Sequence, residues 1–156
     1  MQDKTNVMRI LEQKKVQYIP HYYDPQEAIA GLDVAKLLNE NPAQTFKTLV
    51  TVAKSNNNYV FVIPVECELD LKKAAKAVGE KNVEMIKQKE LLPLTGYIHG
   101  GCSPIGMKKY FSTVIDASAL NFDTIIVSAG RLGVQVELNP KDFEKVIRIK
   151  FENITI

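Results

Sequence analysis

The residues best suited to hold a reacting group lie between Gly100 and Lys109, in the run GGCSPIGMKK. Three glycines and a proline fall within seven positions, which predicts a tight backbone path with amides free to face a ligand. Such amides suit an oxyanion or a ribose hydroxyl. A glycine-rich turn between two strands fits the pattern equally well. The G-x-x-x-x-G-K-[ST] spacing is absent, so the run is not a P-loop.

One cation stands in an unusual place. Lys47 interrupts the apolar and β-branched run FKTLVTV at residues 46–52. A lysine inside a strand either keeps an edge strand from pairing with another chain or directs its ammonium into a site. Taken by itself, the run favours the edge-strand interpretation.

The side chains that act as nucleophiles elsewhere are less well placed here. His99 and Cys102 lie three positions apart, which allows a thiol–imidazole dyad, and His21 and Cys67 would complete a set of four zinc ligands. However, the sequence has no C-x-x-C pair, no residue plainly placed to orient a histidine and no G-x-S-x-G elbow. We therefore expect a packed Cys102, no metal, and two reduced thiols.

Short elements must position these residues, beginning with a helix that Asp3 is expected to cap. Asp70 and Gly79 bound the clearest helix, over residues 70–78, and apolar spacing predicts another over 31–39. The first-half strands are rich in β-branched and aromatic residues and cover residues 18–23, 46–54 and 59–65.

The second half is richer in strands than in helices. Pro140 is expected to open a short helix that continues to Val146. The predicted strands cover residues 83–86, 97–99, 113–116, 124–128, 134–138 and 148–156. Because strands outnumber helices without a regular alternation, the pattern predicts a mixed sheet flanked by helices and disfavours a doubly wound nucleotide fold.

Composition and charge limit the class of protein. A chain of 156 residues, 46% apolar and 24% charged, suits one soluble domain over residues 1–156. No apolar run reaches the ~18–20 residues of a membrane span, and the N-terminus does not resemble a secretion signal, so we expect a cytosolic protein. Residues 71–109 carry eight lysines and three glutamates, or +5. This excess fits either a phosphate-binding surface or a solvated helix face.

Four blocks of sequence occur in order over nearly the whole chain. They are FKTLV at 46–50, ELDLKKAAK at 68–76, GY at 96–97 leading into GGCSPIG at 100–106, and VSAGRLG at 127–133. Together, at this spacing, they closely resemble the YbaK/EbsC family of Cys-tRNA(Pro) deacylases, relatives of the editing domain inserted in bacterial prolyl-tRNA synthetases.

The resemblance implies a fold and an activity. The fold is a single compact mixed α/β domain, with a mixed, barrel-like sheet flanked by helices. The activity is editing in trans, in which prolyl-tRNA synthetase attaches cysteine by mistake and the deacylase removes it. The expected partners are therefore aminoacyl-tRNA, here Cys-tRNA(Pro), and prolyl-tRNA synthetase, with no membrane, metal or other cofactor involved.

The resemblance also implies the catalytic residues. Lys47 matches the essential lysine of the family, which outweighs the edge-strand interpretation, and Thr48 follows it in the same block. Gly100 matches a loop glycine whose backbone positions the substrate. Gly101 is expected to offer a second amide beside it.

The resemblance also implies residues that bind the substrate, and at two positions this sequence differs from the family. Tyr23, or its neighbour Tyr22, matches a tyrosine at the pocket, and Ser128 matches a serine in the second glycine-containing loop. Ala30 stands where better-studied members have a phenylalanine, a difference expected to loosen amino-acid selectivity. Cys102 replaces an apolar residue in the GG-x-SP loop.

The mechanism that the resemblance suggests needs no nucleophile from the protein. The cysteine of the substrate attacks its own ester carbonyl, which gives a thiolactone and free tRNA; a cysteine thiol has a pKa near ~8.5 and is partly ionised at neutrality. Three alternatives remain: an Ala-tRNA(Pro) deacylase with a water nucleophile, a non-catalytic module that binds tRNA or nucleotides, and a hydrolase that uses Cys102.

Overall fold

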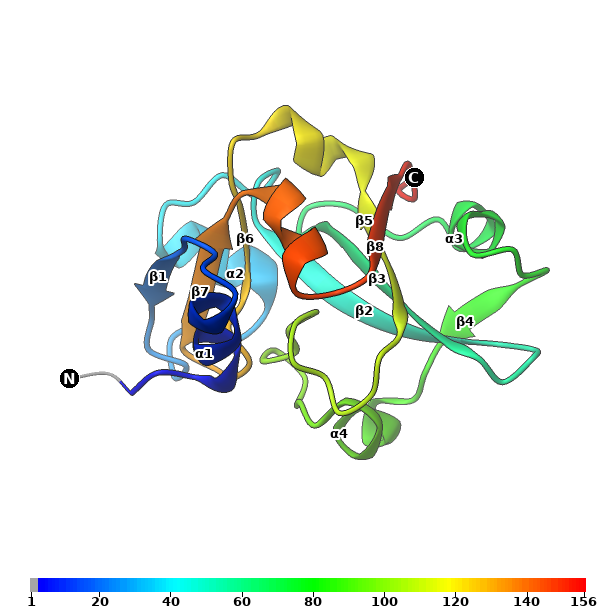
Figure 1. Cartoon of the computed structure of the whole chain (residues 1–156), viewed down its shortest axis with the longest axis horizontal. Coiled ribbons are helices and arrows are strands. Elements are labelled where there is room, and N and C mark those ends of the chain that lie inside the picture. The colour runs from blue at the N-terminus through cyan, green and yellow to red at the C-terminus, as the bar shows by residue number, and fades with distance from the viewer. Residues whose placement is uncertain (1–2) are drawn as a thin grey trace.

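The computed structural model describes residues 3–156, so that residues 1 and 2 of the predicted domain lie outside the described residues (Figure 1). Within this range eight strands form two sheets. The smaller sheet is antiparallel, in the order β1 (Ile19–Tyr22), β7 (Val134–Leu138), β6 (Ile125–Ser128).

The larger sheet is mixed. Its order is β4 (Val83–Met85), β2 (Phe46–Ala53), β3 (Asn58–Pro64), β5 (Ser112–Asp116), β8 (Ile149–Glu152). The first three strands pair antiparallel, whereas β5 and β8 are added in parallel. The prediction of a mixed α/β class is confirmed.

The prediction of a barrel-like core is wrong in one respect, because the sheets do not close into a barrel. Among the described residues they meet through a single parallel bridge, between Thr45 and Ile126, where the amide of Ile126 donates to the carbonyl of Gln44. A closed barrel would need a continuous ladder at this junction. The two sheets instead share one apolar core, to which both β2 and β6 contribute.

Four α-helices surround the sheets within residues 3–156: α1 (Asn6–Gln13), α2 (Gly31–Leu37), α3 (Leu71–Ala77) and α4 (Gln88–Thr95). Short 3₁₀ helices cover Ala117–Asn121 and Pro140–Lys145. None of the helices in this range is long and apolar enough to span a bilayer.

The predicted helix over residues 70–78 is confirmed, together with its cap. The Asp70 carboxylate accepts from the amides of Lys72 and Lys73, and Ala74 and Ala75 are buried. The first helix also forms, but Thr5 caps it instead of Asp3, since the Thr5 hydroxyl accepts from the amide of Met8 at 3.2 Å. Asp3 lies too early in the chain to reach this first turn.

The segment before the glycine-rich run differs from its prediction. Residues 97–99 form a loop and not a strand, and α4 precedes them as a helix that the sequence did not indicate. Pro93 lies inside α4, where it removes one helical hydrogen bond. The helix ends two residues later at Thr95, followed by Gly96 in the left-handed region with φ of 86°.

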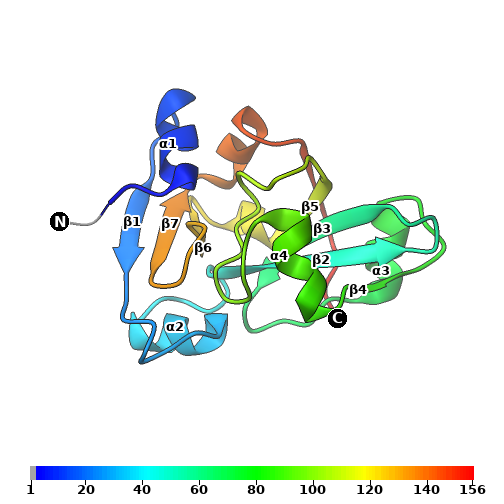
Figure 2. The same ribbon diagram turned by 90° about the horizontal axis from the view of Figure 1, so that it is seen from below.

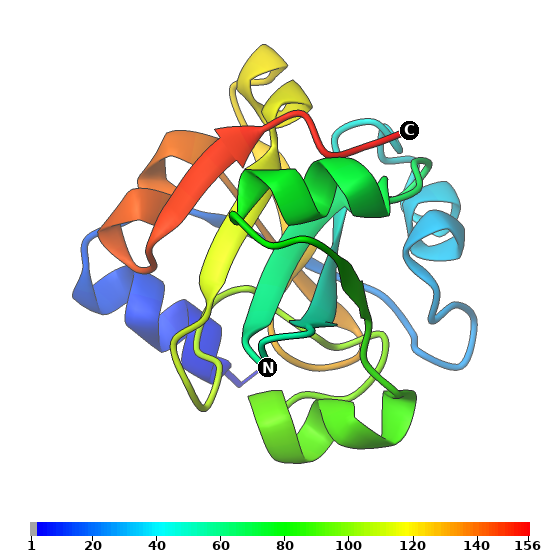
Figure 3. The same cartoon turned by 90° about the vertical axis from the view of Figure 1, so that its right-hand side faces the viewer.

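The helices α3 and α4 pack on opposite faces of the larger sheet. Side chains of β3 alternate between these faces: Phe61 and Ile63 join the apolar cluster that contains Ala74 of α3, whereas Val60 and Val62 belong to the core against which Leu91 of α4 packs. Figure 3 shows the two helices well apart.

Candidate active site

The first half of β2 is a free edge. Strand β4 pairs with β2 only from Thr51 to Ala53, so that no strand of the described residues covers Phe46 to Leu49 on that side. A cavity of about 470 Å³ lies here, and five successive residues, 45–49, line it. Its other walls come from α2, α4, the loop at 99–102 and the smaller sheet, an arrangement seen in Figure 2.

Most of the residues predicted for the site are brought together in this cavity. Those that line it are Tyr23, Ala30, Lys47, Thr48, Gly100 and Ser128. Tyr23 faces the cavity, whereas Tyr22 lies in β1 and is 38% exposed. Of these two tyrosines, Tyr23 is the one that lines the cavity.

Gly101 lies behind this lining. Its amide donates to the carbonyl of Ile98 at 3.0 Å, so it is not free to stabilise an oxyanion. A Cβ atom at Gly101 would stand 3.1 Å from the backbone of Arg131 and Leu132. The expectation of a second loop amide for the substrate is therefore corrected: Gly101 holds the loop against the segment 131–132.

Gly100 meets two separate requirements for glycine. Its φ is 86°, in the left-handed region that side chains disfavour. An added Cβ would stand 2.7 Å from Ile29 Cγ2 and 2.9 Å from Leu132 Cδ2. Among the described residues no acceptor bonds its amide, which is thus available at the cavity.

Lys47 and Thr48 offer unsatisfied polar groups. No carboxylate among residues 3–156 forms an ion pair with Lys47, which is half-buried in the cavity wall. The Thr48 hydroxyl is buried without a hydrogen-bond partner in the described chain. A cation and a hydroxyl of this kind suit a phosphate or a ribose oxygen.

Cys102 lines the cavity but is poorly suited to attack a substrate. The residue is 9% exposed, and burial raises the pKa of its thiol to about 12. The thiol is therefore protonated near neutrality, whereas the nucleophile in cysteine catalysis is the thiolate. His99, the proposed base, is exposed. Within the described residues no three of His, Cys, Asp and Glu lie close enough to hold a metal ion.

The smaller sheet contributes a polar face that the sequence prediction missed. Strand β7 reads VQVEL, so that Val134, Val136 and Leu138 point into the core while Gln135 and Glu137 share the opposite face. Gln135 pairs with His21 on β1 and with Ser128 on β6. The strict alternation in this strand was the available signal, but a polar strand face is ordinarily taken to be solvated.

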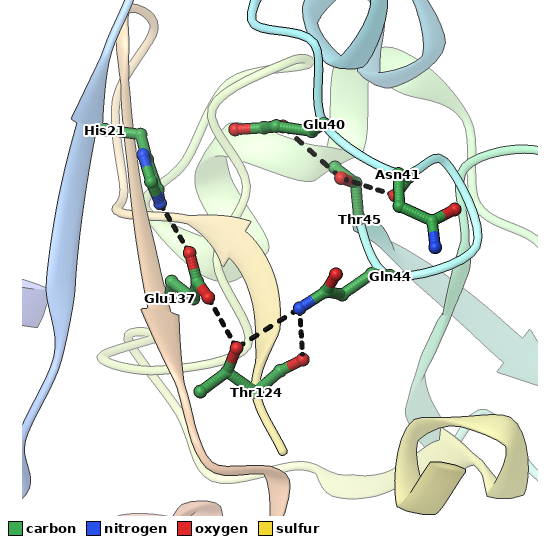
Figure 4. A network of polar contacts seen from close by, with 7 residues as sticks. All are labelled: His21, Glu40, Asn41, Gln44, Thr45, Thr124 and Glu137. Carbon is green, nitrogen blue, oxygen red and sulfur yellow. Dashed lines mark hydrogen bonds and ion pairs between the residues drawn. The ribbon is translucent and has the colours of Figure 1, made fainter. Parts of the chain in front are cut away.

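A hydrogen-bond network fixes one part of this face (Figure 4). Nε2 of His21 lies 2.7 Å from Glu137 Oε1, and the Thr124 hydroxyl donates to the other carboxylate oxygen. The Gln44 amide donates to the Thr124 carbonyl at 2.8 Å. Burial raises the pKa of Glu137, but the bonds from Thr124 and His21 outweigh it, so that the net pKa is lowered.

Glu40 lies beside this network in a less satisfied state. The Thr45 hydroxyl donates to one of its oxygens at 3.3 Å. Burial raises the pKa of Glu40, and the amide of Gln135 and the charge of His21 only partly oppose this effect. The carboxylate is therefore partly desolvated next to Gln135, a lining residue.

The basic segment is divided by the fold. Lys72, Lys73 and Lys76 lie on α3, against the face of the larger sheet that is turned away from α4. Lys87 and Lys89 lie at the start of α4, whose Leu91 lines the cavity. Lysines that are close in sequence therefore lie on two separate surfaces.

A cavity of about 470 Å³ suits a small ligand group and is too small for a nucleic-acid stem. The family model of the aminoacyl-tRNA editing domain matches residues 27–146. The chain belongs to this family and is an aminoacyl-tRNA editing enzyme.

Individual relatives extend the match beyond that range. The chain is 46% identical over 155 residues to EbsC of Enterococcus faecalis, a candidate Cys-tRNA(Pro)/Cys-tRNA(Cys) deacylase. The aligned region covers 99% of this chain and 94% of the relative. The fold matches the crystal structure of a candidate trans-editing enzyme for prolyl-tRNA synthetase, with a TM-score of 0.82, 19% identity and 99% of each chain covered. Hypothetical protein APE2540 matches with a TM-score of 0.85 at 20% identity, over 96% of this chain and 99% of its own.

The burial of Cys102 predicts an inert thiol. In the folded protein at pH 8, iodoacetamide should label the half-buried Cys67 slowly, because burial raises the pKa of its thiol too, and leave Cys102, whose pKa is raised to about 12, unmodified until the chain is unfolded. Peptide mass spectrometry of labelled protein measures both sites. Cys102→Ser should keep deacylation within about fivefold of the wild type, since only packing changes.

A thousandfold loss of activity in a folded Cys102→Ser variant would instead restore the thiol nucleophile. Cys67→Ser is the matched control for effects of removing a thiol elsewhere.

The division of the lysines predicts unequal roles in tRNA binding. Replacing Lys87 and Lys89 with alanine should lower the slope of log affinity against log salt by about 1.5, because each lost phosphate contact removes roughly 0.7–0.9. Replacing Lys72 and Lys76 on α3 removes the same charge from the other face and should leave the slope unchanged. Fluorescence titrations of tRNA at several salt concentrations distinguish the two pairs. If both variants show the same slope of log affinity against log salt, tRNA does not prefer the α4 surface to the α3 surface.

Proposed function

We propose that this chain, over residues 1–156 as one editing domain, acts in trans as a cytosolic deacylase that removes cysteine from Cys-tRNA(Pro). Prolyl-tRNA synthetase is the proposed source of the mischarged tRNA and a partner in its transfer. The observation that carries the proposal is the cavity itself, which offers an unpaired cation and a free loop amide but no ionised nucleophile. The 46% identity with a candidate Cys-tRNA deacylase supports the choice of cysteine.

A cavity without a nucleophile suits a substrate that supplies its own. The thiolate of the cysteinyl group attacks the ester carbonyl, so that a carbon–sulfur bond forms and the carbon–oxygen bond to the ribose breaks. The products are a thiolactone and a free ribose hydroxyl, which takes up the proton that the thiol has lost. The protein has to fold the ester into an attacking geometry and stabilise the oxyanion that develops.

Different lining residues position the ester and stabilise the oxyanion. In this proposal the amide of Gly100, which no acceptor of the described residues bonds, donates to the oxyanion, and Lys47 binds a terminal phosphate or ribose oxygen. The Ser128 hydroxyl accepts from the Gly130 amide at 3.2 Å, which leaves its own proton free to be donated to the substrate. Tyr23 and Thr48 add two hydroxyl groups to the lining, and Ala30 contributes a small side chain to it.

Lys47 should be essential for the reaction but not for the fold. Lys47→Ala should lower the rate of Cys-tRNA(Pro) deacylation by roughly a hundredfold or more, the usual effect of removing a positioned charge from a reacting site. The melting temperature should change little, because the ammonium forms no ion pair within the described chain. Lys54→Ala, just beyond the end of β2, is the matched control and should keep full activity.

Two results would contradict this assignment. A Lys47→Ala variant that remains active places the lysine outside the mechanism, and one that unfolds gives it a structural role.

The substrate thiol should be required even when the rest of the substrate is intact. S-methylcysteinyl-tRNA and Ser-tRNA should bind but be cleaved at least a hundredfold more slowly than Cys-tRNA, since neither forms a thiolate. Shape alone discriminates such small groups by only ~1–3 kcal/mol. Mass spectrometry of the released product should detect the thiolactone or cysteine formed from it.

Rapid cleavage of S-methylcysteinyl-tRNA by the wild-type protein would exclude the substrate thiol as the nucleophile. The water-using Ala-tRNA(Pro) deacylase would then be the better assignment, and a parallel assay with Ala-tRNA(Pro) would measure it.

A further inference from the structure

Two acceptor oxygens are left without donors beside the cavity. Oε1 of Gln135 and Oε2 of Glu40 are buried, and neither has a hydrogen-bond partner among the described residues. Gln135 is only 6% exposed, so water does not solvate its side chain freely. Buried acceptors of this kind are uncommon in folded proteins, because an unmade hydrogen bond is costly.

The two acceptors belong to one place. Gln135 lines the cavity from the middle strand of the smaller sheet, next to its pairing partner Ser128, which also lines it. Glu40 follows α2, and the side-chain amide of Gln135 stabilises its carboxylate. Glu40 therefore lies next to the Gln135 side chain, whose amide oxygen is unpaired among the described residues.

The neighbouring polar groups do not donate a hydrogen bond to either of these two oxygens. His21 and Glu137 act on Glu40 by charge alone, and they are bonded to one another at 2.7 Å. Thr124 and Gln44 are occupied by the same network (Figure 4). Lys47 stands on the other sheet, in β2. None of these groups donates to the Gln135 oxygen, and Gln135 lines the cavity in which a ligand would bind.

An aminoacyl ester has one group that matches an unpaired acceptor in the cavity wall with a carboxylate behind it. Its α-amino group carries up to three N–H donors and a positive charge, whereas a ribose hydroxyl offers one donor and a thiol is a weak donor. We propose that Gln135, held by Glu40, accepts a hydrogen bond from the α-amino group of the aminoacyl ester and selects substrates in which that group is free. This inference rests on the proposed deacylase function.

The consequence is a distinction between two classes of charged tRNA. In peptidyl-tRNA the α-nitrogen is an amide with a single N–H and no charge, so it offers no positive charge to the Glu40 carboxylate behind Gln135. Gln135 would thereby protect growing peptides from hydrolysis, while the free aminoacyl ester is bound with its carbonyl between Gly100 and the smaller sheet.

The test combines a change in the enzyme with a change in the substrate. Cys-tRNA(Pro) is compared with 3-mercaptopropionyl-tRNA(Pro), which keeps the thiol and the ester but lacks the α-amino group. The wild type should prefer Cys-tRNA by roughly ten- to a hundredfold in kcat/KM, after each rate is divided by that of the uncatalysed reaction. Gln135→Leu should lower this preference by about tenfold, through a loss on Cys-tRNA alone.

Two further variants make the result specific. Glu40→Gln keeps the shape of the carboxylate but removes its charge, and it should also lower the preference. Gln44→Leu makes the same change as Gln135→Leu in a glutamine that does not line the cavity, and it should leave the preference unchanged. A partly unfolded variant loses activity equally on both substrates, so that the ratio still reports recognition.

Equal losses on both substrates, or an unchanged preference in Gln135→Leu and Glu40→Gln, would overturn the inference while leaving the deacylase function in place. A wild-type protein that cleaves neither substrate would overturn the proposed function and this inference with it.

Discussion

The site depends on the close approach of two backbone segments, 100–101 and 131–132. Gly100 and Gly101 lie so near to Leu132 and Arg131 that a Cβ at either glycine would stand about 3 Å or less from its neighbours. In this loop the Gly101 amide is bonded to the carbonyl of Ile98, whereas Gly100 lines the cavity with an amide that no acceptor of the described residues bonds. Any side chain at Gly100 would have to move Ile29 and Leu132, and with them the cavity walls.

The free edge of β2 is the second condition for the cavity. An edge strand normally exposes unpaired amides and carbonyls to other chains. Here α2, α4 and the smaller sheet surround the open half, so that Lys47 lies in a cavity wall and not on an open edge. The edge-strand interpretation of Lys47 was therefore correct about the backbone and incomplete about the side chain.

The sequence predicted local structure better than it predicted contacts. Asp70, Gly79 and the alternation of Val134–Leu138 carry their own structural signals, and these elements form as expected. The helix α4 did not follow from its residues, because Pro93 and Gly96 indicate a break although an eight-residue helix tolerates both. The resemblance supplied Lys47 and Gly100, whereas Gln135 and Glu40 could be found only once strand pairing and burial were known.

Shape contributes little to selectivity in such a cavity. Ala30 contributes only a small side chain to the lining, and cysteine, serine and alanine differ by a single small group, worth only ~1–3 kcal/mol in a binding pocket. The unpaired acceptors of Gln135 and Glu40 match the α-amino group, a part that all amino acids share. Recognition of this common part would hold any small aminoacyl ester in the same orientation. Discrimination then falls to the reaction itself, because only the cysteinyl ester carries a group that ionises near neutrality and reaches its own carbonyl.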